Sequence, residues 1–329
     1  MPSKRLTERI SKRLRVALKL RTPLVLMYHR VGNESFDPWE LVVEERRFRE
    51  QMMFLRAHRT PISLVEFVAL LRRGKLPRTA VAVTFDDGYA CNVLRAARLL
   101  FENHIPATIF ITTRPVIEAR EFWWDELERV ILAIDDERLA LELPDRQLEI
   151  FLGPRRKNDR EWPPGATART PRQSAYYEAW SALRQLGPDQ QRSILDNLRS
   201  SYGISSQPRE SHRPMGNSEV RDLRKFGIDV GAHSLTHTSL PSRNSDEKRS
   251  EIDGSRDACA DMTGVAPRTF AYPYGDFDDE TARLVEASGF DCACTTVEAS
   301  VLGANLYRLP RIQVRNWSAR EFAKALVSV

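Results

Sequence analysis

The sequence predicts a barrel-like α/β domain that is interrupted by an insertion. Short apolar segments of strand length alternate with segments whose apolar residues recur at helical spacing. This alternation stops between about residues 114 and 216 and then resumes. Strands that alternate with helices indicate βα units and a parallel sheet. The 329 residues and 42% hydrophobic content are sufficient for a substantial core.

Before the insertion, the expected strands and helices follow one another closely. The first strand, TPLVLMYHRV, is an apolar run bounded by Pro23 and Gly32, and the second helix ends at the stop signals Gly74 and Pro77. The expected strands cover residues 22–31, 79–87 and 106–113, and the expected helices cover residues 46–59, 63–77 and 89–105.

The insertion itself is expected to be mostly helical. FWWDELERVILAI has a helical pattern, LALELPDRQLEIFLG alternates like a β-hairpin, and a polar, proline-rich loop precedes two further helices. These parts cover residues 122–134, 139–153, 155–171, 173–187 and 189–203.

After the insertion, the strand and helix alternation returns. Glycines at positions 227, 264 and 289 provide stop signals for three of the helices. The expected helices cover residues 217–227, 245–264, 279–290 and 318–329, and the expected strands cover residues 228–234, 267–275 and 291–296.

Composition and charge exclude some classes of protein. The formal charge of +5 is mild for this length, and no long Lys/Arg block with interleaved aromatic residues is present, so we expect no nucleic-acid partner. The four cysteines have no CxxC spacing and lie in apolar surroundings. We therefore expect small buried hydrophobic side chains and a reducing compartment.

Residues 1–21 are expected to form a basic, amphipathic segment ahead of the catalytic domain, residues 22–329. Four apolar residues recur there at helical spacing: Leu6, Ile10, Leu14 and Ala17. Such a helix could pack on the domain or make peripheral contact with an anionic membrane face. The segment lacks a continuous apolar h-region, and no apolar run approaches the ~20 residues of a membrane-spanning helix. We therefore expect a cytoplasmic protein, and a peripheral contact of the segment, if it is not packed on the domain, would be with the inner membrane face.

Unusual polar residues follow four of the expected strands. In a parallel α/β fold, active groups gather at the carboxyl ends of the strands, before the next helices begin. The residues at those ends are His29, Asp86, Asp87, His233, His237 and Tyr274. We therefore expect one functional site that draws on four strand ends.

The adjacent aspartates of AVTFDDGYA indicate a metal site. Two adjacent, partly buried carboxylates cannot both ionise cheaply unless a cation lies near them or one has another function. HSLTH places His233 and His237 four residues apart, and a carboxylate from another strand would complete a two-histidine, one-carboxylate set with open positions for water. The second aspartate would then be free to act as a base.

Each of these motifs has a simpler interpretation when it stands alone. Asp-Asp-Gly often forms only a turn or a helix cap, and an HxxxH pair can be solvent-exposed or simply hydrogen-bonded. Tyr274 could be a packing residue of the core, and His29 could be structural. The metal interpretation gains its weight from the combination at successive strand ends.

The motifs TFDDGY, HSLTH and AYPYG, in this order, resemble those of the polysaccharide deacetylase family, also called carbohydrate esterase family four or the NodB homology domain. The resemblance covers residues 22–112 and 216–317. It implies an incomplete (β/α) barrel and a divalent-metal hydrolase that removes acetyl groups from sugars. It also implies metal ligation by Asp87, His233 and His237, with zinc as the usual ion.

The resemblance further implies that Asp86 is the general base and that Tyr274 belongs to the groove wall. There its ring could pack on a sugar and its backbone N–H could face the oxyanion.

Two family features are absent at their usual places. Ala271 stands where the family often has an arginine that pairs with the base, and LYRLPRIQV contains no histidine to act as the general acid. We therefore expect Arg311 to hold Asp86 ionised and His29 to supply the acid, as in a branch of the family with an early-strand histidine.

The aromatic pair in FWWDEL has two interpretations. Trp123 and Trp124, with Asp125, follow a predicted strand near the expected mouth of the site, where an aromatic face could stack on a sugar. The pair could equally anchor the inserted helices to the barrel.

Together these patterns predict a metal-dependent carbohydrate deacetylase. Its expected partner is an N-acetylated glycan or a lipid-linked saccharide. Two alternatives remain: a carbohydrate-binding protein built on a degenerate deacetylase fold, and a hydrolase of another non-peptide C–N amide bond. The retention of both aspartates and both histidines favours an enzyme, because a binding protein has no need of a free base beside a metal.

Overall fold

The computed structural model describes residues 22–163 and 165–327. The predicted amphipathic segment 1–21 lies outside the described residues, so its packing and its membrane contact stay predictions. Among the described residues, no helix combines the length and the apolar composition that crossing a bilayer requires.

The core of the fold is an eight-stranded sheet in which every pair of neighbouring strands is parallel. Its order is β11-β10-β9-β6-β5-β1-β12, with β4 beside β5. The strands are β1 (Leu24–Tyr28), β4 (Thr60–Pro61), β5 (Ala80–Phe85), β6 (Ala107–Ile111), β9 (Ile228–Ala232), β10 (Thr269–Ala271), β11 (Cys292–Cys294) and β12 (Ile312–Gln313). In the described part of the chain, no ladder joins the end strands β11 and β12, and the sheet forms a half-barrel.

The apolar composition of the central strands explains their burial. All residues of β1 and β5 are buried, and both strands are almost continuously apolar, as expected for parallel strands that are covered on both faces. The predicted incomplete α/β barrel is therefore confirmed. Three of the four cysteines, Cys259, Cys292 and Cys294, are buried, and Cys91 is partly buried.

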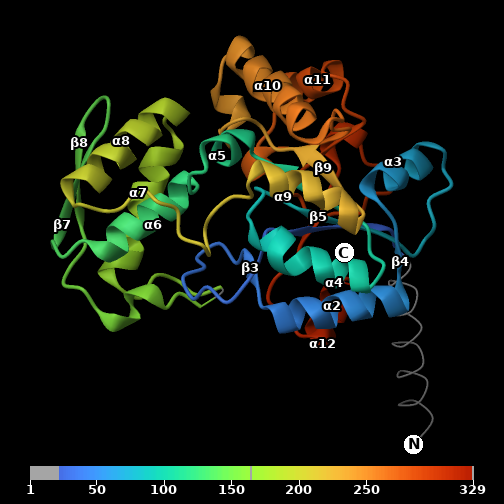
Figure 1. Ribbon diagram of the computed structural model, residues 1–329, viewed down its shortest axis with the longest axis horizontal. Coiled ribbons are helices and arrows are strands. Elements are labelled where there is room, and N and C mark those ends of the chain that lie inside the picture. The colour runs from blue at the N-terminus through green and yellow to red at the C-terminus, as the bar shows by residue number, and fades with distance from the viewer. Residues whose placement is uncertain (1–21, 164, 328–329) are drawn as a thin grey trace, which may run out of the picture.

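Helices cover the outside of the sheet (Figure 1). In the view of Figure 1, α2, α4 and α12 lie together below the sheet, whereas α10 and α11 lie together above it. The helices of this part are α2 (Glu45–His58), α3 (Leu64–Arg72), α4 (Ala97–Glu102), α5 (Thr113–Glu118), α9 (Asn217–Asp222), α10 (Ser245–Thr263), α11 (Asp279–Ala287) and α12 (Ala319–Ala325). A π-helical turn, Asn92–Ala96, precedes α4.

The insertion folds as a lobe beside the half-barrel, on the left of Figure 1. It contains α6 (Trp123–Ala133), the antiparallel hairpin β7 (Arg138–Glu142) and β8 (Gln147–Phe151), α7 (Pro171–Arg184) and α8 (Pro188–Ser201). The predicted helix, hairpin and helix pair are thus all present. A second short sheet, β2 (Arg30–Val31) with β3 (Val42–Val43), was not predicted, and neither was α5.

A buried arginine fixes the position of α6 within this lobe. The guanidinium of Arg172 donates hydrogen bonds to the carbonyls of Ile131 (2.6 Å) and Ile134 (2.8 Å) at the end of α6, and to those of Asp136 (3.0 Å) and Gly153 (3.2 Å). The last carbonyls of a helix have no partner within the helix, so this side chain satisfies buried acceptors that would otherwise have no hydrogen bond. The carboxyl end of helix α6 is thereby fixed within the lobe.

Candidate active site

The predicted site residues come together at the carboxyl ends of the strands. They surround a cavity of about 320 Å³. Six of the seven line it: His29, Asp86, Asp87, His233, His237 and Tyr274. Arg311, the seventh, lies behind Asp86 and is fully buried.

Asp86 is bound by Arg311 through two hydrogen bonds. The Nη1 and Nη2 groups of Arg311 donate to Oδ1 and Oδ2 of Asp86, each at 2.7 Å, and Arg311 also donates to the Thr295 carbonyl at 2.9 Å. Burial would raise the pKa of Asp86, but the charge and hydrogen bonds of Arg311, together with the nearby His233 and His29, outweigh burial and lower the pKa below its ordinary value. Asp86 is therefore held as a carboxylate with the geometry of a strong bidentate pair.

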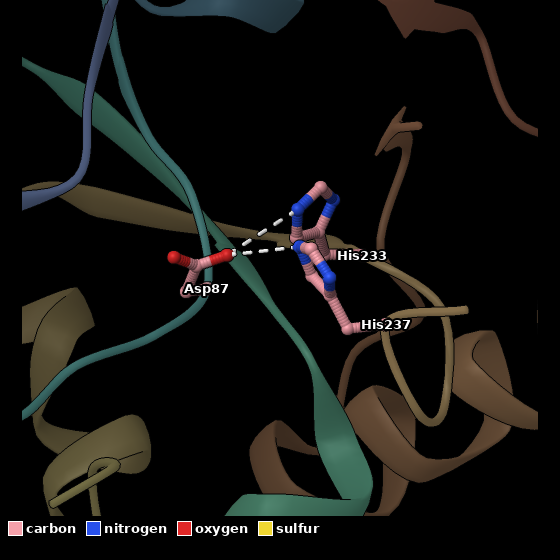
Figure 2. A group of neighbouring side chains, drawn as sticks. All are labelled: Asp87, His233 and His237. Atoms are coloured by element: carbon pink, nitrogen blue, oxygen red, sulfur yellow. Dashed lines mark ion pairs between the residues drawn. The ribbon is translucent and has the colours of Figure 1, made fainter. Parts of the chain in front are cut away.

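Asp87 faces the two histidines instead (Figure 2). Its Oδ1 lies 3.2 Å from Nε2 of His237 and 3.6 Å from Nε2 of His233. Burial opposes ionisation of Asp87, yet the two imidazoles hold its pKa well below the usual range. The neighbouring carboxylates thus have different partners, which lie beside strands on opposite sides of β5 in the sheet.

The donor set of Asp87, His233 and His237 fits a divalent metal ion. The Nδ1–H of His233 donates to the Ala271 carbonyl at 2.7 Å, which leaves the Nε2 lone pair directed toward Asp87. Burial lowers the pKa of His237 and so favours the neutral imidazole that binds metals. In a tetrahedral zinc site with bonds of about 2.1 Å, ligand atoms lie roughly 3.4 Å apart, close to both measured separations.

Backbone conformation at the site is unusual. Four non-glycine residues there have positive φ angles: Asp87 (74°), Ser234 (60°), His237 (62°) and Tyr274 (58°). Such conformations cost free energy and persist only where the surroundings enforce them. For the HSLTH loop, the Glu251 carboxylate does so by accepting hydrogen bonds from the backbone N–H groups of Leu235 (2.9 Å) and Thr236 (3.0 Å).

His29 lies on the cavity wall after β1. It is partly buried, and burial lowers the pKa of its imidazole, although the negative charges of Asp87 and Asp86 oppose this shift. The structure therefore brings His29 into the same cavity as the aspartate pair, as expected from its place at a strand end.

The sequence analysis missed several residues that line the cavity, among them Trp39, Trp180 and Arg184. Trp180 and Arg184 lie on α7 of the insertion, far from any strand end, and neither belongs to a motif. The Arg184 guanidinium lies 4.5 Å from the centre of the Tyr274 ring and pairs with Asp276 at 2.5 Å. The insertion therefore forms one wall of the cavity.

A second cluster contains three possible metal ligands, Asp125, Glu128 and His212. Its carboxylates pair with arginines instead. Arg209 donates to Glu128 at 2.7 Å, and Arg30 lies 3.9 Å from Asp125. These guanidinium groups already balance the carboxylates, so the cluster is a buried ionic network that joins α6 to the half-barrel.

Comparisons with known proteins agree with this fold. The family model for polysaccharide deacetylase matches residues 73–133 and 200–293. Streptococcus pyogenes deacetylase PplD, in complex with acetate, superposes with a TM-score of 0.61 over 93% of this chain and 98% of that chain, at 16% identity. IcaB from Ammonifex degensii superposes with a TM-score of 0.55 over 93% and 97%, at 17% identity. In sequence and in fold, the chain is similar to members of the polysaccharide deacetylase family.

Curated relatives include two enzymes called poly-beta-1,6-N-acetyl-D-glucosamine N-deacetylase. The one from Escherichia coli K12 is 22% identical over 314 residues, which are 93% of this chain and 38% of that protein. The one from Staphylococcus epidermidis is 33% identical over 106 residues, which are 28% of this chain and 37% of that protein. This chain therefore spans well under half the length of these relatives.

The different partners of the two aspartates lead to different metal contents in their variants. Asp87→Asn removes a charged ligand and should weaken Zn²⁺ binding by at least ~10-fold, whereas Asp86→Asn should keep wild-type zinc content because its carboxylate faces Arg311. Elemental analysis of both variants after equilibration with Zn²⁺ measures this, with circular dichroism to check folding. Equal zinc loss in the two folded variants would contradict the assignment.

Proposed function

We propose that this protein is a metal-dependent hydrolase that removes acetyl groups from an N-acetylated amino sugar of a polysaccharide. The observation that carries the proposal is the division of the aspartate pair: Asp86 is bound by a fixed guanidinium, and Asp87 faces two imidazole nitrogens. Two curated relatives are named as N-deacetylases of poly-beta-1,6-N-acetyl-D-glucosamine, which supports the same substrate class.

In this proposal Asp87, His233 and His237 hold the ion, which we take to be Zn²⁺. A cation there would lower the pKa of water and polarise the acetyl carbonyl. Asp86 accepts the proton of the attacking water, and Arg311 keeps it ionised for that purpose. The Tyr274 backbone N–H, which has no hydrogen-bond acceptor among the described residues, is available to the oxyanion.

His29 then acts as the general acid. The water oxygen bonds to the acetyl carbon, the C–N bond breaks, and the amine nitrogen takes a proton from the imidazolium of His29 as it leaves. The products are acetate and the free amino sugar. The place of His29 on the wall of the cavity that also holds the aspartate pair supports this role.

Acetate release tests the proposed function. We expect wild-type protein with Zn²⁺ to release acetate from an oligomer of β-1,6-linked N-acetylglucosamine, in a panel that also contains chitin oligomers and an N-acetylated lipid-linked sugar. Asp86→Asn and His29→Gln should each lower kcat by about 10²–10⁴-fold at unchanged zinc content, because each removes one proton transfer.

The control for this assay is Asp229→Asn, at the exposed amino end of β9, which should retain wild-type turnover. Zinc-loaded wild type that releases no acetate from any member of the panel would contradict the proposal. Near-normal turnover of His29→Gln would remove only the role of His29.

Arg311 sets the pH range in which the base works. Asp86 must be ionised, and the guanidinium lowers its pKa, so the wild-type activity is lost only when pH falls through that lowered value. Arg311→Met removes the positive charge, raises the Asp86 pKa and should move the acidic limb of kcat/KM to higher pH. An acidic limb at the wild-type position in a folded, zinc-loaded Arg311→Met variant would contradict the role of this pair.

A further inference from the structure

The His237 imidazole lies between two aromatic rings. Its ring centre is 4.6 Å from that of Trp124, at an interplanar angle of 60°, and 4.4 Å from that of Tyr274, at 83°. The Nδ1 atom of His237 is buried and has no hydrogen-bond partner among the described residues. His233 differs, because its Nδ1–H is fixed by the Ala271 carbonyl.

This difference needs a physical explanation. A histidine that binds a metal usually donates its other ring N–H to an acceptor, and that bond fixes the orientation of the ring. The orientation of His237 must therefore be fixed in another way. The edge-to-face contacts with Trp124 and Tyr274 restrict the ring from two sides.

Hydrogen bonds from two tryptophans in the first turn of α6 fix both of these rings. The Nε1–H of Trp123 donates to the Tyr274 hydroxyl at 3.2 Å. The Nε1–H of Trp124 donates to the Tyr89 hydroxyl at 2.9 Å, and that hydroxyl donates to Oδ2 of Asp125 at 2.6 Å. The two adjacent tryptophans, with rings at 81° to one another, thus each fix one side of His237.

The Tyr89 end of this chain of contacts is firmly anchored. The Arg30 guanidinium lies 4.7 Å from the centre of the Tyr89 ring, and Arg209 donates to the Asp125 carbonyl at 2.8 Å. Phe122 stacks on Trp124 at 4.8 Å and 11°. Because Trp124 is buried between Phe122 and His237, it offers little surface on which a sugar could stack.

We propose that Trp124 and Tyr274 form an aromatic clamp that positions His237 for metal binding, and that Tyr89 and Trp123 are positioning residues which hold the clamp. This deepens the proposed function and rests on its assignment of His237 as a ligand. The segment FWWDEL of the insertion is then part of the metal site, a role different from both sugar stacking and simple anchoring.

Metal titration tests the clamp without an activity assay. Tyr89→Phe removes one hydroxyl, and Trp124→Leu removes one side of the clamp. We expect Zn²⁺ affinity, measured by calorimetry, to fall about 10-fold for Tyr89→Phe and further for Trp124→Leu, with a changed visible spectrum of the Co²⁺-substituted protein. The matched control is Tyr177→Phe, which loses a hydrogen bond from its hydroxyl to the Pro38 carbonyl (3.3 Å) at a residue that does not line the cavity.

The outcomes separate the two proposals. Wild-type Zn²⁺ affinity and Co²⁺ spectra in both variants would overturn the clamp, and so would an equal loss of affinity in Tyr177→Phe. A wild-type protein that binds no Zn²⁺ would overturn the clamp and the proposed function together. A wild type that binds Zn²⁺ and releases no acetate, with weakened binding only in the two clamp variants, would overturn the proposed function and support the clamp.

Discussion

The burial of two adjacent carboxylates is the constraint on which the rest of this site depends. Asp86 and Asp87 are each about 2% exposed, and two such charges are tolerated inside a protein only if each has its own positive or polarised partner. The sheet provides these partners symmetrically. Strand β5 lies two strands from β9 and two strands from β12, on opposite sides, so Asp87 meets the histidines after β9 while Asp86 meets Arg311 beside β12.

The insertion takes part in this arrangement. Helix α6 is fixed at its end by Arg172 and at its start by the tryptophan contacts to Tyr89 and Tyr274. Helix α7 adds Trp180 and Arg184 to the cavity wall. A lobe outside the parallel sheet therefore contributes to the surroundings of a metal-ligand candidate and to the wall of the cavity. The packing between lobe and half-barrel is thus part of the site.

Much of this could be predicted from the sequence, and the exceptions have physical reasons. Long buried strands such as β1 and β5 are continuous apolar runs, whereas two-residue strands such as β12 carry no periodicity. The pairing of Arg311 with Asp86 was expected from the family resemblance, because Ala271 stands where the family often has the arginine that pairs with the base. The contacts of Trp123 and Trp124 could not be predicted, because an indole has the same local pattern whether it faces a sugar or a histidine.

In the proposed site, Asp87 binds the metal while Asp86 stays paired with Arg311. Anomalous diffraction at the zinc absorption edge, from crystals equilibrated with Zn²⁺, tests it most directly. We expect a peak about 2.1 Å from Asp87, His233 and His237, with both hydrogen bonds from Arg311 to Asp86 retained. Coordination by Asp86, or a peak at the cluster of Asp125, Glu128 and His212 in place of this one, would contradict it.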